Sequence, residues 1–197
     1  MFIKKTSGYI VSPFVSASTK GALDIFIPKT TVSNQWKHWK AQIDPKTCLT
    51  CFTRHGKVYH VSEYIPDEPP LHPVCRCVIE MMDAIAPGDA TRDGESGADY
   101  HLRYYGKLPD YYLSRSELIA LGWKSSKPPA KYAPGKMLFG GIYYNDEGKL
   151  PSAAGRIWYE ADINYYSGKR NGHRIVFSND GLIFVTYNDG FTYYEVT

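Results

Sequence analysis

The sequence predicts an α+β fold in which helices precede an antiparallel β-sheet, with a small cysteine-containing module ahead of both. A helix-start signal near residue 114 is followed by short alternating stretches separated by turns, an order typical of an α+β domain. Cysteines and tyrosines are also segregated along the chain. We therefore expect a module at residues 1–90, a linker at 91–97 and the α+β domain at 98–197.

The segregation of the two residue types supports this division. All four cysteines precede residue 78, whereas only Tyr9, Tyr59 and Tyr64 of the 17 tyrosines precede residue 98. Residues 87–97 are polar and rich in glycine, as linkers commonly are.

The composition is that of an ordinary soluble protein, with 43% hydrophobic and 22% charged residues. No apolar run approaches the ~20 residues that a membrane helix needs, so no membrane association is expected. Met1 to Lys5 carry the charge of a signal peptide, but no apolar stretch with a cleavage site follows. A net charge of +3 does not by itself indicate a nucleic-acid-binding protein.

A helix is expected to begin after Ser114, which forms a capping box with Glu117. Leu118 and Leu121 supply its apolar face, and Gly122 ends it. Arg115 then lies in the first turn, where a helix N-terminus and a guanidinium together suit a phosphate. An ordinary solvated arginine would give the same pattern.

Five stretches after this helix are expected to be strands of an antiparallel sheet: residues 141–144, 156–163, 174–178, 182–186 and 191–196. Alternation places Glu160 and Asp162 on one face of their strand. Beyond the turn at Gly168, Arg170 and Arg174 bring two guanidinium groups toward these carboxylates. This pattern fits either a catalytic site or a solvated salt-bridge face, and alternation alone does not decide between them.

The cysteines form two close pairs, Cys48 and Cys51, then Cys75 and Cys77, separated by 23 residues. Two such pairs can present four thiolates to a structural zinc ion, with His72 as a spare nitrogen ligand. Free thiols and disulfides are the alternatives. Without an export signal, zinc is the first expectation and disulfides are the last.

Residues 33–82 resemble the C-terminal end of phage Mu F-like head-morphogenesis (minor head) proteins. The most specific piece is the string His72-Pro73-Val74-Cys75-Arg76-Cys77. The resemblance implies a phage or prophage origin and phage virion proteins as partners. It implies no chemistry.

Residues 98–197 resemble the barnase-type, guanyl-preferring bacterial ribonucleases. The motifs that match in order and spacing include Lys107-Leu108-Pro109-Asp110, Ala120-Leu121-Gly122-Trp123, Glu147-Gly148-Lys149-Leu150-Pro151 and Glu160-Ala161-Asp162-Ile163-Asn164-Tyr165. The resemblance implies a barnase-like fold, with N-terminal helices packed on an antiparallel sheet. It also implies cleavage of single-stranded RNA without a cofactor, through a 2′,3′-cyclic phosphate, and an inhibitor protein resembling barstar as a partner.

The resemblance also implies roles for particular residues. Glu160 matches the general base, and Arg170 and Arg174 match the arginines that grip the phosphate. Arg115 stands where the family carries a lysine, and Asp162 matches the carboxylate that orients the arginines.

The resemblance assigns base recognition to a loop. Glu147 matches the residue that reads the Watson–Crick edge of guanine, and Tyr144, Asn145 and Asp146 would offer backbone N–H groups to the base. The family has serine and arginine where this loop has Tyr144 and Asp146. Because Glu147 matches the guanine-reading residue, the resemblance implies cleavage after guanosine despite these two differences.

The general acid departs from the family pattern. The family has a histidine in the turn before the last strand, where this chain has Asp189. His173 has the wrong strand parity to replace it, because its ring should point away from the cleft. General acid catalysis is typically worth ~10²–10⁴ in rate. Three possibilities follow: a slowed nuclease using Asp189 or water, a nuclease with another acid, or a fold retained only for binding.

The sequence thus leaves three functions open. The first is a metal-independent endoribonuclease that acts as a phage- or prophage-borne toxin or effector. The second is a catalytically degenerate RNA-binding protein, and the third is a virion-associated structural protein. The expected location is cytoplasmic or virion-associated, with export by a non-standard route as the alternative because the family is secreted.

Overall fold

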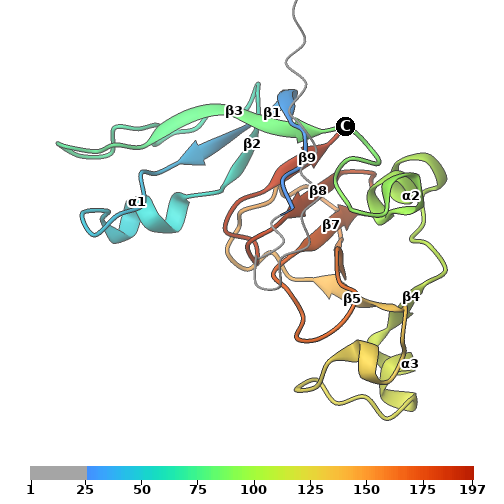
Figure 1. Ribbon diagram of the computed structural model, residues 1–197. Coiled ribbons are helices and arrows are strands. Elements are labelled where there is room, and N and C mark those ends of the chain that lie inside the picture. The colour runs from blue at the N-terminus through green and yellow to red at the C-terminus, as the bar shows by residue number, and fades with distance from the viewer. Residues whose placement is uncertain (1–25) are drawn as a thin grey trace, which may run out of the picture.

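One continuous sheet of nine strands runs through residues 26–197, the part of the chain that the computed structural model describes (Figure 1). The strands are β1 (Thr31–Lys40), β2 (Val58–His60), β3 (Val78–Ile85), β4 (Tyr112–Ser114), β5 (Met137–Tyr143), β6 (Trp158–Asp162), β7 (Arg174–Ser178), β8 (Ile183–Thr186) and β9 (Tyr194–Val196). The helices are α1 (Leu49–Arg54), α2 (Ala98–Tyr105) and α3 (Arg115–Ala120), and two 3-10 turns span Gly94–Ser96 and Pro129–Lys131.

The α+β class is confirmed, and the sheet is mixed rather than wholly antiparallel. Its strand order is β2-β1-β3-β9-β8-β7-β6-β5-β4. The strands from β5 to β9 pair antiparallel, whereas β3 with β9 and β4 with β5 pair parallel. A parallel pair needs a long connection, and here β9 returns to β3 only after the whole C-terminal half has been traversed.

Helix α2 packs on one face of the central strands. Its Ala98 and Leu102 are buried in an apolar core with Ile163, Ile175 and Val185. Ile175 of β7 and Val185 of β8 point toward α2 on this face, as strand alternation requires.

The opposite face of the sheet is shared between the two halves of the sequence. Trp36 of β1 and Met82 of β3 are buried in the same core as Trp158, Val176 and Phe184 of the central strands. In Figure 1, β1, β2 and β3 extend to one side, and β3 continues the sheet beyond β9. The cysteine-containing segment is therefore joined to the C-terminal half by both a strand pair and a core.

The segment expected to be a linker is an ordered turn that leads into α2. The buried carboxylate of Asp99 accepts hydrogen bonds from the Gly88 and Ala90 N–H groups at 2.7 and 3.0 Å, and from the Thr91 hydroxyl at 2.8 Å. Its position in the first turn of α2 also places an acidic side chain at the end of the helix where the dipole favours one.

Helix α3 has the predicted start. Ser114 accepts from the Glu117 N–H at 3.2 Å, and Glu117 accepts from the Ser114 N–H at 2.7 Å, which confirms the capping box. Leu118 anchors the helix in a small core with Trp123 and Leu138. Within the described residues, no helix has the length and apolar character to cross a membrane.

Candidate active site and metal centre

Strands β6 and β7 place the predicted catalytic residues on one face of the sheet. Glu160 pairs with Val176, and Asp162 pairs with Arg174, in an antiparallel register. Ala161, between the two carboxylates, points the other way into the core beneath α2. Strand alternation therefore places both carboxylates on one face, as predicted, and that face also carries the core around Trp158 and Val176.

Asp162 fixes the two arginines. Its side chain is fully buried and accepts two hydrogen bonds from Arg170, from Nε at 2.7 Å and from Nη2 at 2.5 Å. The Nε of Arg174 lies 3.3 Å from the same carboxylate. The hydrogen bond with Asp162 raises the pKa of Arg170 above its ordinary value. Asp162 thus holds both guanidinium groups in a defined orientation.

A cavity of about 220 Å³ lies over this face, and Glu160, Arg170, Arg174 and Asp189 all contribute to its lining. The Glu160 carboxylate makes no hydrogen bond or ion pair with any residue in the described part of the chain. A carboxylate that faces two arginines without a committed partner is available to accept a proton from a bound molecule.

Gly140 gives Glu160 its room. A Cβ built at Gly140 would lie 2.7 Å from Oε1 and 2.8 Å from Cγ of Glu160. The register between β5 and β6 shifts at this point, between Phe139 and Gly141. The glycine therefore lets the carboxylate lie directly against β5.

Asp189 occupies the turn between β8 and β9 at the edge of the cavity. Its φ of 53° is in the left-handed region, and its N–H donates to the Gly172 carbonyl at 2.9 Å. The carboxylate is 76% exposed and lies 3.7 Å from Nη2 of Arg174. The structure thus brings Asp189 to the same cavity as Glu160 and the two arginines.

Three further side chains of the cavity were not expected. Tyr143 and Tyr193 line it with their hydroxyls 2.9 Å apart, and Thr186 lines it from β8. Burial raises the pKa of both tyrosines, so their hydroxyls stay protonated. Alternation along β8 indicated the face of Thr186, but the tyrosine pair depends on the approach of β5 and the final turn, which no local pattern reveals.

Arg115 does not line this cavity. Its guanidinium lies over the Trp123 ring, 5.8 Å from the ring centre, because α3 packs at the far edge of the sheet beside β4 and β5. His173 also lies elsewhere: its ring contacts Tyr187 and its Nδ1 lies 3.3 Å from the Asn164 amide.

The predicted guanine loop is braced internally. Asn145 donates to the Leu150 carbonyl at 2.7 Å and accepts from the Leu150 N–H at 3.0 Å. The Asp146 N–H donates to the Tyr144 carbonyl at 2.8 Å. Glu147 is 73% exposed and pairs with Lys149 at 2.8 Å. The Glu147 carboxylate is therefore exposed but engaged by Lys149, while Asn145 holds the loop in shape.

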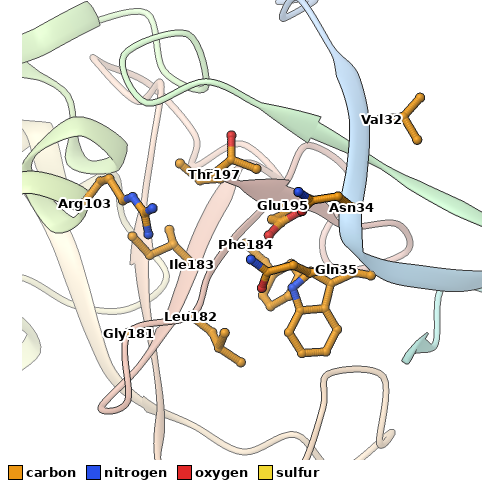
Figure 2. Close-up of a pocket in the computed structure, with 12 residues that line it drawn as sticks. Val32, Asn34, Gln35, Arg103, Gly181, Leu182, Ile183, Phe184, Glu195 and Thr197 are labelled. Carbon is orange, nitrogen blue, oxygen red and sulfur yellow. The ribbon is translucent and has the colours of Figure 1, made fainter. Parts of the chain in front are cut away.

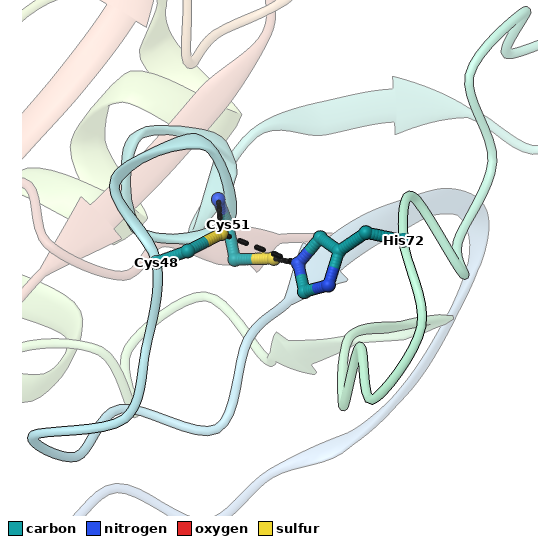
Figure 3. A group of neighbouring side chains, drawn as sticks. All are labelled: Cys48, Cys51 and His72. Atoms are coloured by element: carbon teal, nitrogen blue, oxygen red, sulfur yellow. Dashed lines mark hydrogen bonds between the residues drawn. The ribbon is translucent and has the colours of Figure 1, made fainter.

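The four cysteines and His72 form two adjoining groups that share Cys51. The Nε2 of His72 lies 3.3 Å from the sulfurs of both Cys48 and Cys51, as Figure 3 shows, and the sulfurs of Cys51 and Cys75 are 3.7 Å apart. Cys51, Cys75 and Cys77 form a second group whose sulfurs all lie within 4.8 Å of one another. All four thiols are free of disulfides. Tetrahedral ligands with bonds of ~2.3 Å stand about 3.7 Å apart, so the spacing suits zinc.

The surroundings of the cluster shift the thiol pKa values in both directions and fix the shape of the loops. Burial raises the pKa of Cys51 well above its ordinary value, whereas the Cys51 N–H donor lowers that of Cys48. Burial raises the pKa of the Cys75 thiol, but N–H donors from Cys77 and Leu71 outweigh it and bring that pKa to about 7. Arg76 binds both carboxylate oxygens of Asp44, at 2.5 and 2.7 Å, and holds the pKa of Asp44 down at about 2. This ion pair ties together the two loops that carry the ligands.

A separate cavity of about 400 Å³ lies between β1 and the β8–β9 strands, as Figure 2 shows. Glu195 lines it, and although the residue is only 6% exposed, its Oε2 has no hydrogen-bond partner within the described residues. Arg103 and Trp36 line the same cavity. It lacks the arrangement of a carboxylate facing two fixed arginines found at Glu160.

Comparisons with known proteins identify the family of the C-terminal half. Residues 96–196 match the family model described as ribonuclease. A ribonuclease of Heyndrickxia coagulans is 54% identical over 90 residues, which are 45% of this chain and 82% of that protein. The ribonucleases of Bacillus intermedius and Bacillus pumilus are also 54% identical over 90 residues, and there the match spans 55% of each protein. The chain belongs to the ribonuclease family.

The N-terminal resemblance is also confirmed. Residues 17–80 match the family model described as phage Mu protein F like protein. The match begins before the described residues and ends within β3, so it includes the cysteine cluster, β1 and β2.

Proposed function

We propose that this chain is an endoribonuclease that cleaves single-stranded RNA in the cavity between Glu160, Arg170 and Arg174. The observation that carries the proposal is the position of Glu160. On a chain of the ribonuclease family, its carboxylate has no partner among the described residues and faces two arginines that Asp162 holds in place. This is the arrangement that a proton acceptor beside a phosphate requires.

The reaction is a transesterification. Glu160 takes the proton from the ribose 2′-hydroxyl, whose oxygen attacks the adjacent phosphorus. The bond from phosphorus to the 5′-oxygen breaks, that oxygen takes up a proton, and a 2′,3′-cyclic phosphate remains. Arg170 and Arg174 stabilise the negative charge that builds on the phosphate oxygens. No step calls on a metal ion.

Asp189 and water are the candidate proton donors to the leaving oxygen. Asp189 lies at the cavity rim, 3.7 Å from Arg174. An aspartate is ordinarily ionised at neutral pH, which makes it a weak general acid. We therefore propose a nuclease that is slower than relatives with a histidine in this turn.

We propose cleavage after guanosine, read by Glu147. Its exposed carboxylate suits the paired N–H donors of the guanine Watson–Crick edge, and Asn145 keeps the loop in shape. Binding of the base would require Glu147 to exchange its contact with Lys149 for the base.

The test is incubation of the purified protein with a fluorescent oligoribonucleotide that contains one guanosine, with EDTA present. The proposal predicts a single cut after the guanosine and a 2′,3′-cyclic phosphate end on the 5′ fragment. Binding without any cut would instead identify a degenerate RNA-binding protein. Cleavage that EDTA abolishes would contradict the metal-independent mechanism.

The Mu F-like segment favours a biological setting. We propose that the protein is a phage- or prophage-borne toxin or effector, with virion proteins as partners. An inhibitor resembling barstar would protect the producing cell, and the two arginines of the cavity would suit an acidic surface on it.

We also propose that Cys48, Cys51, Cys75 and Cys77 hold a structural zinc ion, with His72 as the alternative fourth ligand. The spacing of their sulfurs and the low pKa of Cys75 support this assignment. Elemental analysis should find about one zinc per chain, and its removal should lower Tm because metal binding contributes to folding. Cys75→Ser should lose the metal, whereas metal content equal to wild type in this variant would contradict the assignment.

A further inference from the structure

A groove of about 540 Å³ lies beside the catalytic cavity, and Asp189 lines both. One wall comes from the C-terminal half, with Glu147, Lys149 and Phe191. The other wall comes from the cysteine-containing segment: Phe52 and Thr53 of α1, and Lys57 just before β2. The groove is therefore built jointly by the two halves of the sequence.

The side chains of the groove combine aromatic rings with cations. Phe52 is 45% exposed, and its ring centre is 5.9 Å from that of Phe191. The Lys57 ammonium pairs with none of the residues in the described part of the chain, so its charge is available to a ligand. Single-stranded nucleic acids are bound by this combination, in which bases stack on aromatic rings and cations follow the phosphates.

The wall from the cysteine-containing segment is held firmly in place. The Val58 N–H donates to the Lys149 carbonyl at 2.7 Å, and the His55 ring packs 4.5 Å from that of Phe191. Gly56 approaches so closely that a Cβ there would lie 2.4 Å from the Phe191 carbonyl oxygen. The backbone that carries Phe52 and Lys57, on either side of this contact, is therefore held against the C-terminal half before any ligand binds.

We propose that this groove is an RNA subsite in which the guanine base assigned to Glu147 stacks on Phe52, beside Phe191, while Lys57 contacts the backbone. The inference rests on the proposed ribonuclease function and adds a role for the Mu F-like segment in holding the substrate. Asp189 lines both the catalytic cavity and the groove. An RNA strand with its phosphate between Arg170 and Arg174 can therefore continue directly into the groove.

The test measures binding separately from cleavage. The probe is a fluorescent hexanucleotide with one 2′-deoxyguanosine, which lacks the attacking hydroxyl and so binds without reacting at that site. Fluorescence anisotropy should show at least a five-fold higher Kd for Phe52→Ala, the loss expected when one base loses its stacking partner. Lys57→Ala should weaken binding and reduce the salt dependence of log Kd by about one unit of slope.

Leu49→Ala is the matched control. Leu49 lies in the same helix and is 76% exposed, but it does not line the groove. It should bind the probe as wild type does. Equal Kd values for wild type, Phe52→Ala and Lys57→Ala, with unchanged Tm, would overturn the inference. If Phe52→Ala folds poorly, Lys57→Ala decides the result alone, because the Lys57 ammonium forms no ion pair within the described residues.

The two proposals fail in different ways. If wild-type protein binds the probe through Phe52 and Lys57 but cuts no all-ribose oligonucleotide, the ribonuclease proposal fails and the subsite stands. If the protein cuts RNA with the same KM in all variants, the subsite fails and the ribonuclease proposal stands.

Discussion

Asp162 sets the geometry of the catalytic cavity at the scale of single residues. Its carboxylate is buried and satisfied by Arg170 and Arg174 together, so the two guanidinium groups are oriented before any substrate binds. Removing one partner of a buried ion pair typically costs 3–5 kcal/mol, because the remaining charge is left uncompensated. Asp162 is therefore a positioning residue, while the arginines are the groups that meet the phosphate.

Gly140→Ala should reduce kcat by about ten- to hundred-fold with a smaller change in KM. The added Cβ would overlap the Glu160 side chain and displace the base from its position against β5. Steady-state kinetics on the guanosine oligonucleotide measures the split. The control is the Tm of the same variant, which should stay near that of wild type if the added methyl displaces only the Glu160 side chain. An unchanged kcat in Gly140→Ala would show that this close approach has no part in catalysis.

Asp189→His should raise cleavage by at least about ten-fold near neutral pH. An imidazole titrates near neutrality and can donate a proton where a carboxylate is already ionised. The φ of 53° at this position is one that histidine, like aspartate, adopts more readily than most residues. Turnover of the guanosine oligonucleotide by both forms across pH 5–8 measures the effect. No gain would mean that another group supplies the proton.

Much of this cavity could be predicted from the sequence, and the remainder depends on contacts between distant segments. Glu160, Arg170 and Arg174 follow from strand alternation together with the order of the family motifs. The close approach at Gly140 and the Tyr143–Tyr193 pair depend on how β5 and the last turn pack beside β6. The pairing register of β5 with β6 sets that packing, and it cannot be read from either strand alone. The distance of Arg115 from the cavity follows from the packing of α3, which a local capping box does not reveal.

At the scale of elements, the junction between α1 and β2 is the contact that connects the Mu F-like segment to the cavity. His55 ends α1, is buried, and accepts the Ala41 N–H through Nδ1 at 3.1 Å. Its other face packs on Phe191, in the turn that carries Asp189. The histidine therefore works as a neutral packing group between the two segments.

Acidification should weaken this junction. Burial, with a smaller contribution from nearby cations, lowers the pKa of His55 below its ordinary value. The unfolded chain therefore binds a proton near pH 6.5 that the folded chain resists, so this contribution to stability is full above pH 6.5 and falls as the pH drops below it. Thermal unfolding at pH 7 and pH 5 should show a smaller loss of Tm in His55→Gln than in wild type. His60→Gln, at an exposed histidine, should behave as wild type, and equal losses in all three would contradict the assignment.

The start of α3 and strands β6, β7 and β8 were predictable because their signals are local. Strand β4 was not predicted, β5 begins at Met137 rather than at residue 141, and β9 begins at Tyr194 rather than at residue 191. The α3 capping box and the strand alternation at β6 and β7 each lie within a few residues. The pairing of β3 with β9 joins residues more than 100 positions apart, and no local pattern specifies it. The same holds for the groove, whose two walls meet only when the sheet is complete.

At the scale of the whole molecule, the two segments that the sequence distinguishes share one sheet and one core. Trp36 and Met82 contribute to the same buried cluster as Trp158 and Phe184. Val176 and Tyr193, which line the catalytic cavity, belong to this shared core. Packing changes in the Mu F-like segment can therefore reach the cavity and alter RNA binding. The division at residues 91–97 remains a prediction about independent folding.

The most direct test of the account is the cleavage rate of Glu160→Gln on the single-guanosine oligonucleotide. The amide keeps the shape of the side chain but cannot accept the proton as a carboxylate does, so kcat should fall at least about a hundred-fold with Tm close to wild type. Glu95→Gln, the same substitution at an exposed glutamate, should retain the wild-type rate. Cleavage at the wild-type rate by folded Glu160→Gln would contradict the assignment of this cavity as the catalytic centre.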